Sequence, residues 1–169
     1  MKKIIKEGLK LAILLLIVTN VISYFRTKDI NAKDNLEIIL NATTINGKSV
    51  KDIIKKDKPL IINFWGTWCP ICAQEVSTLS KLAKRGDFTL ITVASKSGSG
   101  QDIKSYMQKK GVNFIVINDS NGDIANKFKI SVFPTTLFYS SNRKSIIKDS
   151  GYTTYAGFLA RVKGVNITK

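Results

Sequence analysis

The apolar and polar positions of the chain alternate in blocks that predict strands and helices in turn. Residues 59–65 and 88–94 are nearly continuous apolar runs, which is typical of strands buried on both faces of a sheet. Residues 113–119 are a third strand candidate. Residues 134–139 and 144–151 are typical of an antiparallel pair joined by a turn.

Between and after these strands the apolar spacing becomes helical. One face of residues 72–85 is apolar, and Gly86 is placed to end that helix. Further helices are predicted over residues 102–110, over a short stretch ending at Phe128 and over residues 154–162. Strands that alternate with helices, followed by a hairpin and a last helix, predict a three-layer α/β domain with a central mixed β-sheet flanked by helices.

The segment ahead of the first buried strand has a weaker pattern. In residues 36–50 the pair Asn46-Gly47 stands between two short apolar runs, which is a hairpin signal. Residues 26–35 are polar and lack periodicity, so they predict a tether.

The N-terminus carries a targeting signal. Residues 11–25 hold no charged side chain, and four lysines precede them. This pattern fits a cleaved signal peptide or an uncleaved signal anchor. The poor cleavage site, of which residues 21–23 are the best candidate, favours the anchor.

Lysines ahead of the apolar run place the N-terminus in the cytoplasm. We therefore expect a single-pass protein of a bacterial inner membrane with its main domain in the periplasm or on the outer surface, where disulfides are permitted. The expected parts are a cytoplasmic basic tail (residues 1–8), a transmembrane signal anchor (residues 9–25), the tether (residues 26–35) and the exported α/β domain (residues 36–169).

The composition removes several chemistries. The chain has no histidine, which excludes triads with a histidine base and histidine metal ligands. Lysine and arginine outnumber aspartate and glutamate by 27 to 12, giving a formal charge of +15. These charges are spread along the chain without an aromatic-interleaved basic motif, so we expect no nucleic-acid partner.

Cys69 and Cys72 are the only cysteines, and three interpretations compete for them. A disulfide across three residues closes a very small loop and is a poor structural staple. Two thiolates without histidine fall short of a zinc site. Cu(I) accepts soft ligands at low coordination, and Met107 is the one other soft side chain beyond Met1.

The redox interpretation explains more of the surroundings. A C-x-x-C motif where a strand feeds a helix places Cys69 at the helix N-terminus, where unpaired N–H groups stabilise a thiolate. Cys69 would then attack, and Cys72, one turn further along, would resolve the mixed disulfide. Pro70 fits the first helical turn, where its missing N–H costs nothing.

Two motifs resemble the thioredoxin superfamily: "NFWGTWCPIC" around the cysteines and "ISVFPTTLFY" about 65 residues later. The intervening segments resemble its membrane-anchored, extracytoplasmic branch, which includes cytochrome c maturation thioredoxins. The two chain ends resemble thioredoxin-like proteins of suppressor-of-copper-sensitivity operons.

The resemblance implies a thioredoxin fold in which Cys69 is the nucleophile and Cys72 the resolving thiol. It also implies a cis bond between Phe133 and Pro134 that faces the cysteines, with the backbone of Phe133 offered to an extended substrate. Trp68 would shape the surface beside the sulfurs, whereas Trp65 fits a core aromatic better.

The sequence departs from that family at three places. Thioredoxins carry a buried aspartate where this chain has Asn63, and a kinking proline where it has Ser77. The glutamate that the cytochrome c branch uses has no clear counterpart, because Glu75 fits a solvated helix face.

Between the cysteines stand Pro70 and Ile71, with no histidine to stabilise the thiolate further, which favours a mild couple. We expect a reductant of protein substrates with disulfides or thiols, without a cofactor and kept reduced by a membrane electron transporter. A disulfide-forming oxidase and a Cu(I)-binding module remain the alternatives.

Overall fold

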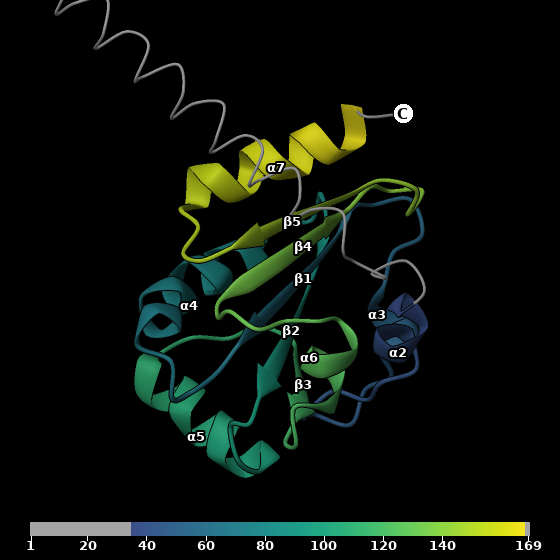
Figure 1. The fold of residues 1–169 in the computed structure, drawn as a ribbon. Coiled ribbons are helices and arrows are strands. Elements are labelled where there is room, and N and C mark those ends of the chain that lie inside the picture. Colours follow the sequence, from purple (N-terminus) through teal and green to yellow (C-terminus); the bar gives the residue numbers. More distant parts are fainter. Residues whose placement is uncertain (1–34, 168–169) are drawn as a thin grey trace, which may run out of the picture. The chain divides into compact units, whose positions relative to one another are not determined.

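A five-stranded sheet organises the computed structural model, which describes residues 35–167 (Figure 1). The strand order is β3-β2-β1-β4-β5. Strands β1, β2 and β3 are parallel, whereas β4 is antiparallel to β1 and β5 to β4. The strands are β1 (Leu60–Trp65), β2 (Thr89–Ser95), β3 (Val116–Asp119), β4 (Thr135–Tyr139) and β5 (Ile146–Ser150). The predicted mixed sheet is confirmed.

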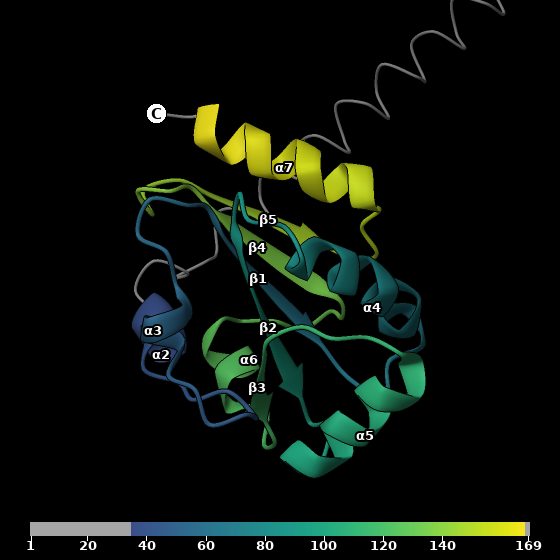
Figure 2. The same cartoon turned by 180° about the vertical axis from the view of Figure 1, so that it is seen from behind.

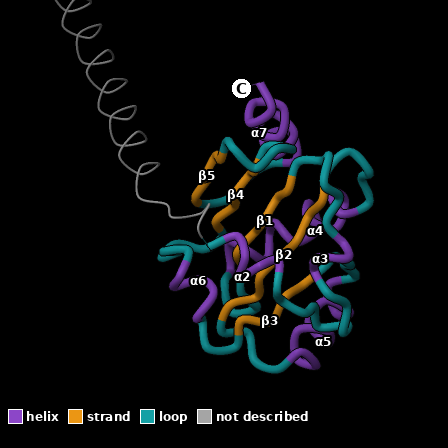
Figure 3. Tube along the Cα trace, turned by 90° about the vertical axis from the view of Figure 1, so that its right-hand side faces the viewer, coloured by secondary structure: helices purple, strands orange, loops and turns teal. Residues whose placement is uncertain are grey.

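Helices cover both faces of this sheet. Figures 1 and 2 show α4 and α5 on one side of the strands and α2 and α3 on the other, and Figure 3 shows the strands running between the helices. The described helices are α2 (Leu36–Leu40), α3 (Val50–Ile53), α4 (Pro70–Ala83), α5 (Gly100–Lys110), α6 (Asp123–Lys127) and α7 (Tyr155–Ile167). The domain therefore has the three layers that the sequence predicts.

Alternation along β1 sends successive side chains to opposite faces. Ile61 and Trp65 belong to a core cluster that includes residues of α4, α5 and α7. Phe64 points the other way and meets Phe128, just after α6, with ring centroids 5.3 Å apart. All six residues of β1 are buried, as expected for a central strand.

The predicted hairpin over residues 36–50 is wrong in its first arm. Leu36 and Ile39, three residues apart, are the buried positions of this segment, so it follows helical periodicity and forms α2. The turn at Asn46-Gly47 is present, with Gly47 at φ 77° and a single bridge between Thr43 and Ser49.

Within residues 35–167 no helix is both long and apolar enough to cross a membrane. The expected basic tail, the signal anchor and nearly all of the tether, residues 1–34, lie outside the described residues.

Candidate active site

The two cysteines lie where the chain leaves β1 and enters α4. Cys69 is the N-cap of α4, and its Sγ accepts a hydrogen bond from the backbone N–H of Cys72 at 3.1 Å. Pro70 occupies the first turn, as expected for a residue without an N–H group. The start of a helix presents unpaired N–H groups, so this position favours negative charge on the Cys69 sulfur.

Cys69 and Cys72 are joined in a disulfide. Both residues are buried, with 4% of Cys69 and 1% of Cys72 exposed. The structure therefore represents the oxidised form of the pair, and Cys69, at the helix start, is the more exposed of the two residues.

A segment far along the chain closes over the disulfide. The peptide bond between Phe133 and Pro134 is cis, as the resemblance implies. The Phe133 carbonyl oxygen lies 3.7 Å from Cys69 Sγ, although 64 residues separate the two. The fold thus brings both sequence motifs to one place.

Apolar side chains surround this place on the surface. Trp68 is 53% exposed, and its ring meets Phe133 edge to face at 5.4 Å. Trp68 Nε1 donates to the Ser95 carbonyl at 2.9 Å, which fixes the ring. Ile71 and Val132 are also exposed.

Trp65 lies in the core instead. It has no exposed area, packs against Tyr106 and Phe114, and donates from Nε1 to Thr92 Oγ1 at 3.1 Å. The core position expected for Trp65 is confirmed, and Trp68 is exposed next to Phe133.

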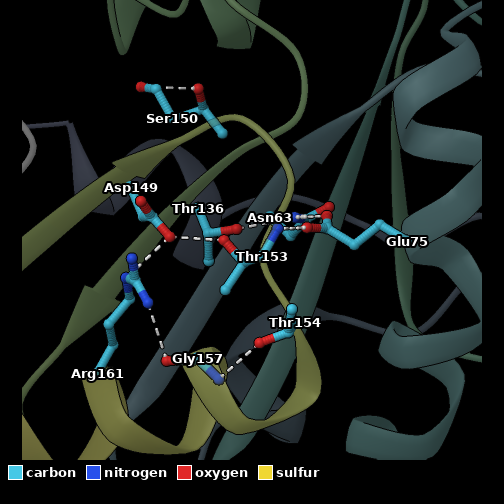
Figure 4. Close-up of polar contacts among 10 residues, drawn as sticks. Asn63, Glu75, Thr136, Asp149, Ser150, Thr153, Thr154, Gly157 and Arg161 are labelled. Carbon is cyan, nitrogen blue, oxygen red and sulfur yellow. Dashed lines mark hydrogen bonds and ion pairs between the residues drawn. The ribbon is translucent and has the colours of Figure 1, made fainter.

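Glu75 corrects one expectation from the sequence. It has no exposed area, whereas a solvated helix face was predicted. Glu75 Oε2 accepts from Asn63 Nδ2 at 3.0 Å, and Oε1 accepts from the backbone N–H of Thr153 at 2.8 Å (Figure 4). Burial raises the pKa of Glu75 to about 7, against the lowering effect of these two hydrogen bonds.

A signal for this burial was present in the sequence. Cys72, Val76 and Leu79 define the buried face of α4, and Glu75 follows Cys72 by three residues on that face. The expectation of a solvated side chain followed from the charge of Glu75 and not from its place on this apolar face. A titratable carboxyl therefore lies one helical turn beyond Cys72.

No group of three or more Cys, Asp or Glu side chains in residues 35–167 is arranged to hold a metal ion. Met107, the soft side chain considered for Cu(I), is buried on α5.

Comparison with known proteins agrees with this geometry. The Redoxin family model matches residues 28–166. A thioredoxin-like protein of Haemophilus influenzae is 30% identical over 161 residues, covering 95% of this chain and 94% of its own. The thiol-disulfide oxidoreductase ResA of Bacillus subtilis is 28% identical over 111 residues, covering 64% and 62%.

Among solved structures, the N-terminal domain of PilB from Neisseria gonorrhoeae superposes with a TM-score of 0.63 and 27% identity, covering 77% of this chain and 91% of that one. The chain belongs to the Redoxin family and has a thioredoxin-like fold. Its enzyme class is thiol-disulfide oxidoreductase of the thioredoxin-like type.

Proposed function

We propose that this enzyme reduces disulfides of protein substrates outside the cytoplasm, through Cys69 and Cys72. The observation that carries the proposal is the place of Cys69 Sγ, between the N–H groups at the start of α4 and the Phe133 carbonyl beside the cis proline. The first environment stabilises an attacking thiolate, and the second offers backbone to a substrate strand.

In the first step the Cys69 thiolate attacks one sulfur of the substrate disulfide. The substrate S–S bond breaks, a mixed disulfide forms with Cys69, and the second substrate sulfur leaves as a thiolate that takes a proton from solvent. Trp68 and Phe133 form an apolar rim where the substrate chain would lie beside Pro134.

In the second step Cys72 resolves the mixed disulfide. Glu75 accepts the proton of the Cys72 thiol, and the resulting thiolate attacks Cys69 Sγ. The bond between Cys69 and the substrate breaks, and the second substrate cysteine is released reduced. Two electrons have then passed from the enzyme to the substrate, leaving the Cys69–Cys72 disulfide. With a pKa of about 7, the Glu75 carboxyl is suited to exchange protons near neutral pH.

The oxidised pair has to be reduced again before the next cycle. We infer that residues 9–25 anchor the chain in the inner membrane and that a membrane electron transporter supplies the electrons. An anchor keeps the domain near such a donor and raises its effective concentration. The lysines at residues 2, 3, 6 and 10 and the uncharged run after them support this topology. Resemblance to the cytochrome c maturation and copper-sensitivity branches supports those two processes as the cellular context.

The test is substrate trapping in cells. A Cys72→Ser variant forms the mixed disulfide through Cys69 but cannot resolve it, so we expect protein adducts that a reductant releases. The matched control is Cys69→Ser, which keeps one thiol but loses the proposed nucleophile. Adducts on Cys69→Ser alone, or on neither variant, would contradict the assignment.

A further inference from the structure

The Glu75 carboxyl is held from the far end of the chain as well as from β1. Thr153, in the loop between β5 and α7, donates its backbone N–H to Glu75 Oε1 at 2.8 Å across 78 residues of sequence. Thr153 is itself buried, with 3% of its surface exposed. An N–H donor at this distance stabilises the carboxylate form over the acid.

The Thr153 side chain is fixed in turn by an ion pair. Thr153 Oγ1 donates to Asp149 Oδ2 at 2.5 Å, and Arg161 Nε lies 2.8 Å from the same oxygen (Figure 4). Arg161 also donates to the Gly157 carbonyl at 3.1 Å, which ties it to the first turn of α7. The arrangement leads from a buried carboxyl to a pair whose side chains are 20% exposed at Asp149 and 35% at Arg161.

The sheet register explains why Asp149 is near. Asn63 on β1 is paired with Thr136 on β4, and Thr136 with Asp149 on β5. Paired residues on neighbouring strands point to the same face, so these side chains form one row that ends at the ion pair.

Two charged and two neutral polar side chains or backbone groups surround Glu75 on this side of the sheet. Asp149 comes from β5 and Arg161 from α7, with neutral donors on Asn63 and Thr153. Cys69 and Cys72, on the carboxyl's own helix, are titratable when reduced. Asp149 opposes ionisation of Glu75 by charge repulsion. Arg161 carries the opposite charge and pairs with the Asp149 carboxylate at 2.8 Å.

We propose that Thr153 is a positioning residue for Glu75, and that the Asp149–Arg161 pair acts on the carboxyl through Thr153 and through its electric field. The inference rests on the proposed role of Glu75 in resolving the mixed disulfide. The active-site carboxyl is therefore tuned by a partly exposed ion pair on β5 and α7, outside the cysteine and cis-proline motifs.

The test is a direct titration of Glu75 in the oxidised full chain in detergent micelles. The chain contains only three glutamates, Glu7, Glu37 and Glu75, so carbon-13 labelling of glutamate gives three carboxyl signals by NMR. The signal that disappears in Glu75→Gln assigns itself. Cysteines in a disulfide do not titrate, so no thiol titration overlaps with that of Glu75.

Each of three variants should change the pKa of Glu75 in a defined direction. Thr153→Val loosens the loop and weakens its N–H bond, so the pKa of Glu75 rises. Asp149→Asn keeps an oxygen for Thr153 and Arg161 but removes the negative charge, so the pKa falls. Arg161→Gln leaves Asp149 unneutralised, so the pKa rises. We expect the pKa of Glu75 to change by about 0.5 to 1 in each variant.

Arg85→Gln is the matched control. It breaks another ion pair, with Asp87 at 2.7 Å, and a hydrogen bond to the Tyr155 hydroxyl at 3.2 Å. Neither partner is hydrogen-bonded to Glu75, so the pKa of Glu75 should stay in place. Changes of the same sign in Asp149→Asn and Arg161→Gln, or no change in Thr153→Val, would overturn the proposal. Where Thr153→Val does not fold, the opposite signs of the other two variants decide.

The pH profile of mixed-disulfide resolution gives a second readout. Its midpoint should move with the pKa of Glu75 in each variant, which a purely structural role would not produce. The two proposals fail separately: if Glu75→Gln resolves at the normal rate, the catalytic role of Glu75 is wrong, whereas the NMR titration still tests the ion pair.

Discussion

Asn63 Nδ2 lies 3.0 Å from Glu75 Oε2 inside the domain, which joins the central strand to the active-site helix. The same amide nitrogen lies 2.9 Å from Thr136 Oγ1, and both hydrogen bonds are buried. Thioredoxins, which this chain resembles, have an aspartate at the position of Asn63. Here the strand supplies a neutral donor and α4 supplies the carboxyl, so the titratable group of this pair belongs to the helix.

Replacing Glu75 should therefore slow the second half of the reaction. Glu75→Gln keeps the size of the side chain but cannot accept the Cys72 proton. Loss of a general base costs on the order of 100-fold in rate. Stopped-flow measurement of the release of a substrate from its mixed disulfide with Cys69 would detect this at pH 7.

The attack by Cys69 is the internal control for that variant. Formation of the mixed disulfide precedes the step assigned to Glu75, so it should slow far less than resolution. Equal slowing of both steps would mean that Glu75 only supports the structure of the site.

Glu75 should also make the stability of the oxidised domain fall as the pH rises. Its pKa is raised from 4.5 to about 7 in the folded state. Between these values the folded chain holds a proton that the unfolded chain has lost, so the stabilisation is complete below pH 4.5 and is lost by pH 7. The expected loss is about 3 kcal/mol.

Denaturant unfolding at pH 5 and pH 8 checks this slope. Glu75→Gln has no proton to lose and should remove this part of the pH dependence. If the unfolding free energy of Glu75→Gln falls with pH as steeply as that of the wild type, the pH dependence comes from other carboxyl groups.

Asn63→Asp should set two carboxyls against each other. The new carboxylate would face Glu75 Oε2 in place of the amide donor, and two close carboxylates cannot both ionise without a large cost. We expect a loss of on the order of 3 kcal/mol in unfolding free energy at pH 8 and a much smaller loss at pH 5. Adding Glu75→Gln to this variant should recover most of the lost stability, since only one carboxylate then remains and no charge repulsion acts on it.

Gly66 should control the apolar rim through Trp68. A Cβ on Gly66 would lie 2.5 Å from Trp68 Nε1, so the ring has to leave its hydrogen bond to the Ser95 carbonyl. Gly66→Ala should raise the KM for a protein substrate by about tenfold, while reduction of a small disulfide changes less. Comparing the two substrates separates this effect from damage at the cysteines, and equal losses would contradict it.

Most of the fold follows from local patterns in the sequence. The buried strands and the helix after the cysteines were predicted within a few residues, because continuous apolar runs and helical spacing each indicate one structure. Gly111, at φ 63°, ends α5 in the left-handed conformation that glycine adopts readily. The segment Leu36–Leu40 was misassigned because five residues are too few to separate strand from helix periodicity.

The redox pair and the cis proline were predictable because each belongs to a motif. The support around Glu75 was not. Asn63, Asp149 and Thr153 meet there only through strand pairing and a loop far along the chain, which no local pattern encodes. Charged residues are seldom buried, so the charge of Glu75 predicted the solvated face of α4 instead of the buried one.

The redox state of Cys69 and Cys72 in growing cells tests the proposed reductase most directly. Acid quenching followed by thiol alkylation would separate the dithiol from the disulfide. The reductase account predicts a mostly reduced pair, because an electron donor must keep it so outside the cytoplasm. A pair found mostly as the disulfide during growth would contradict that account and favour the oxidase.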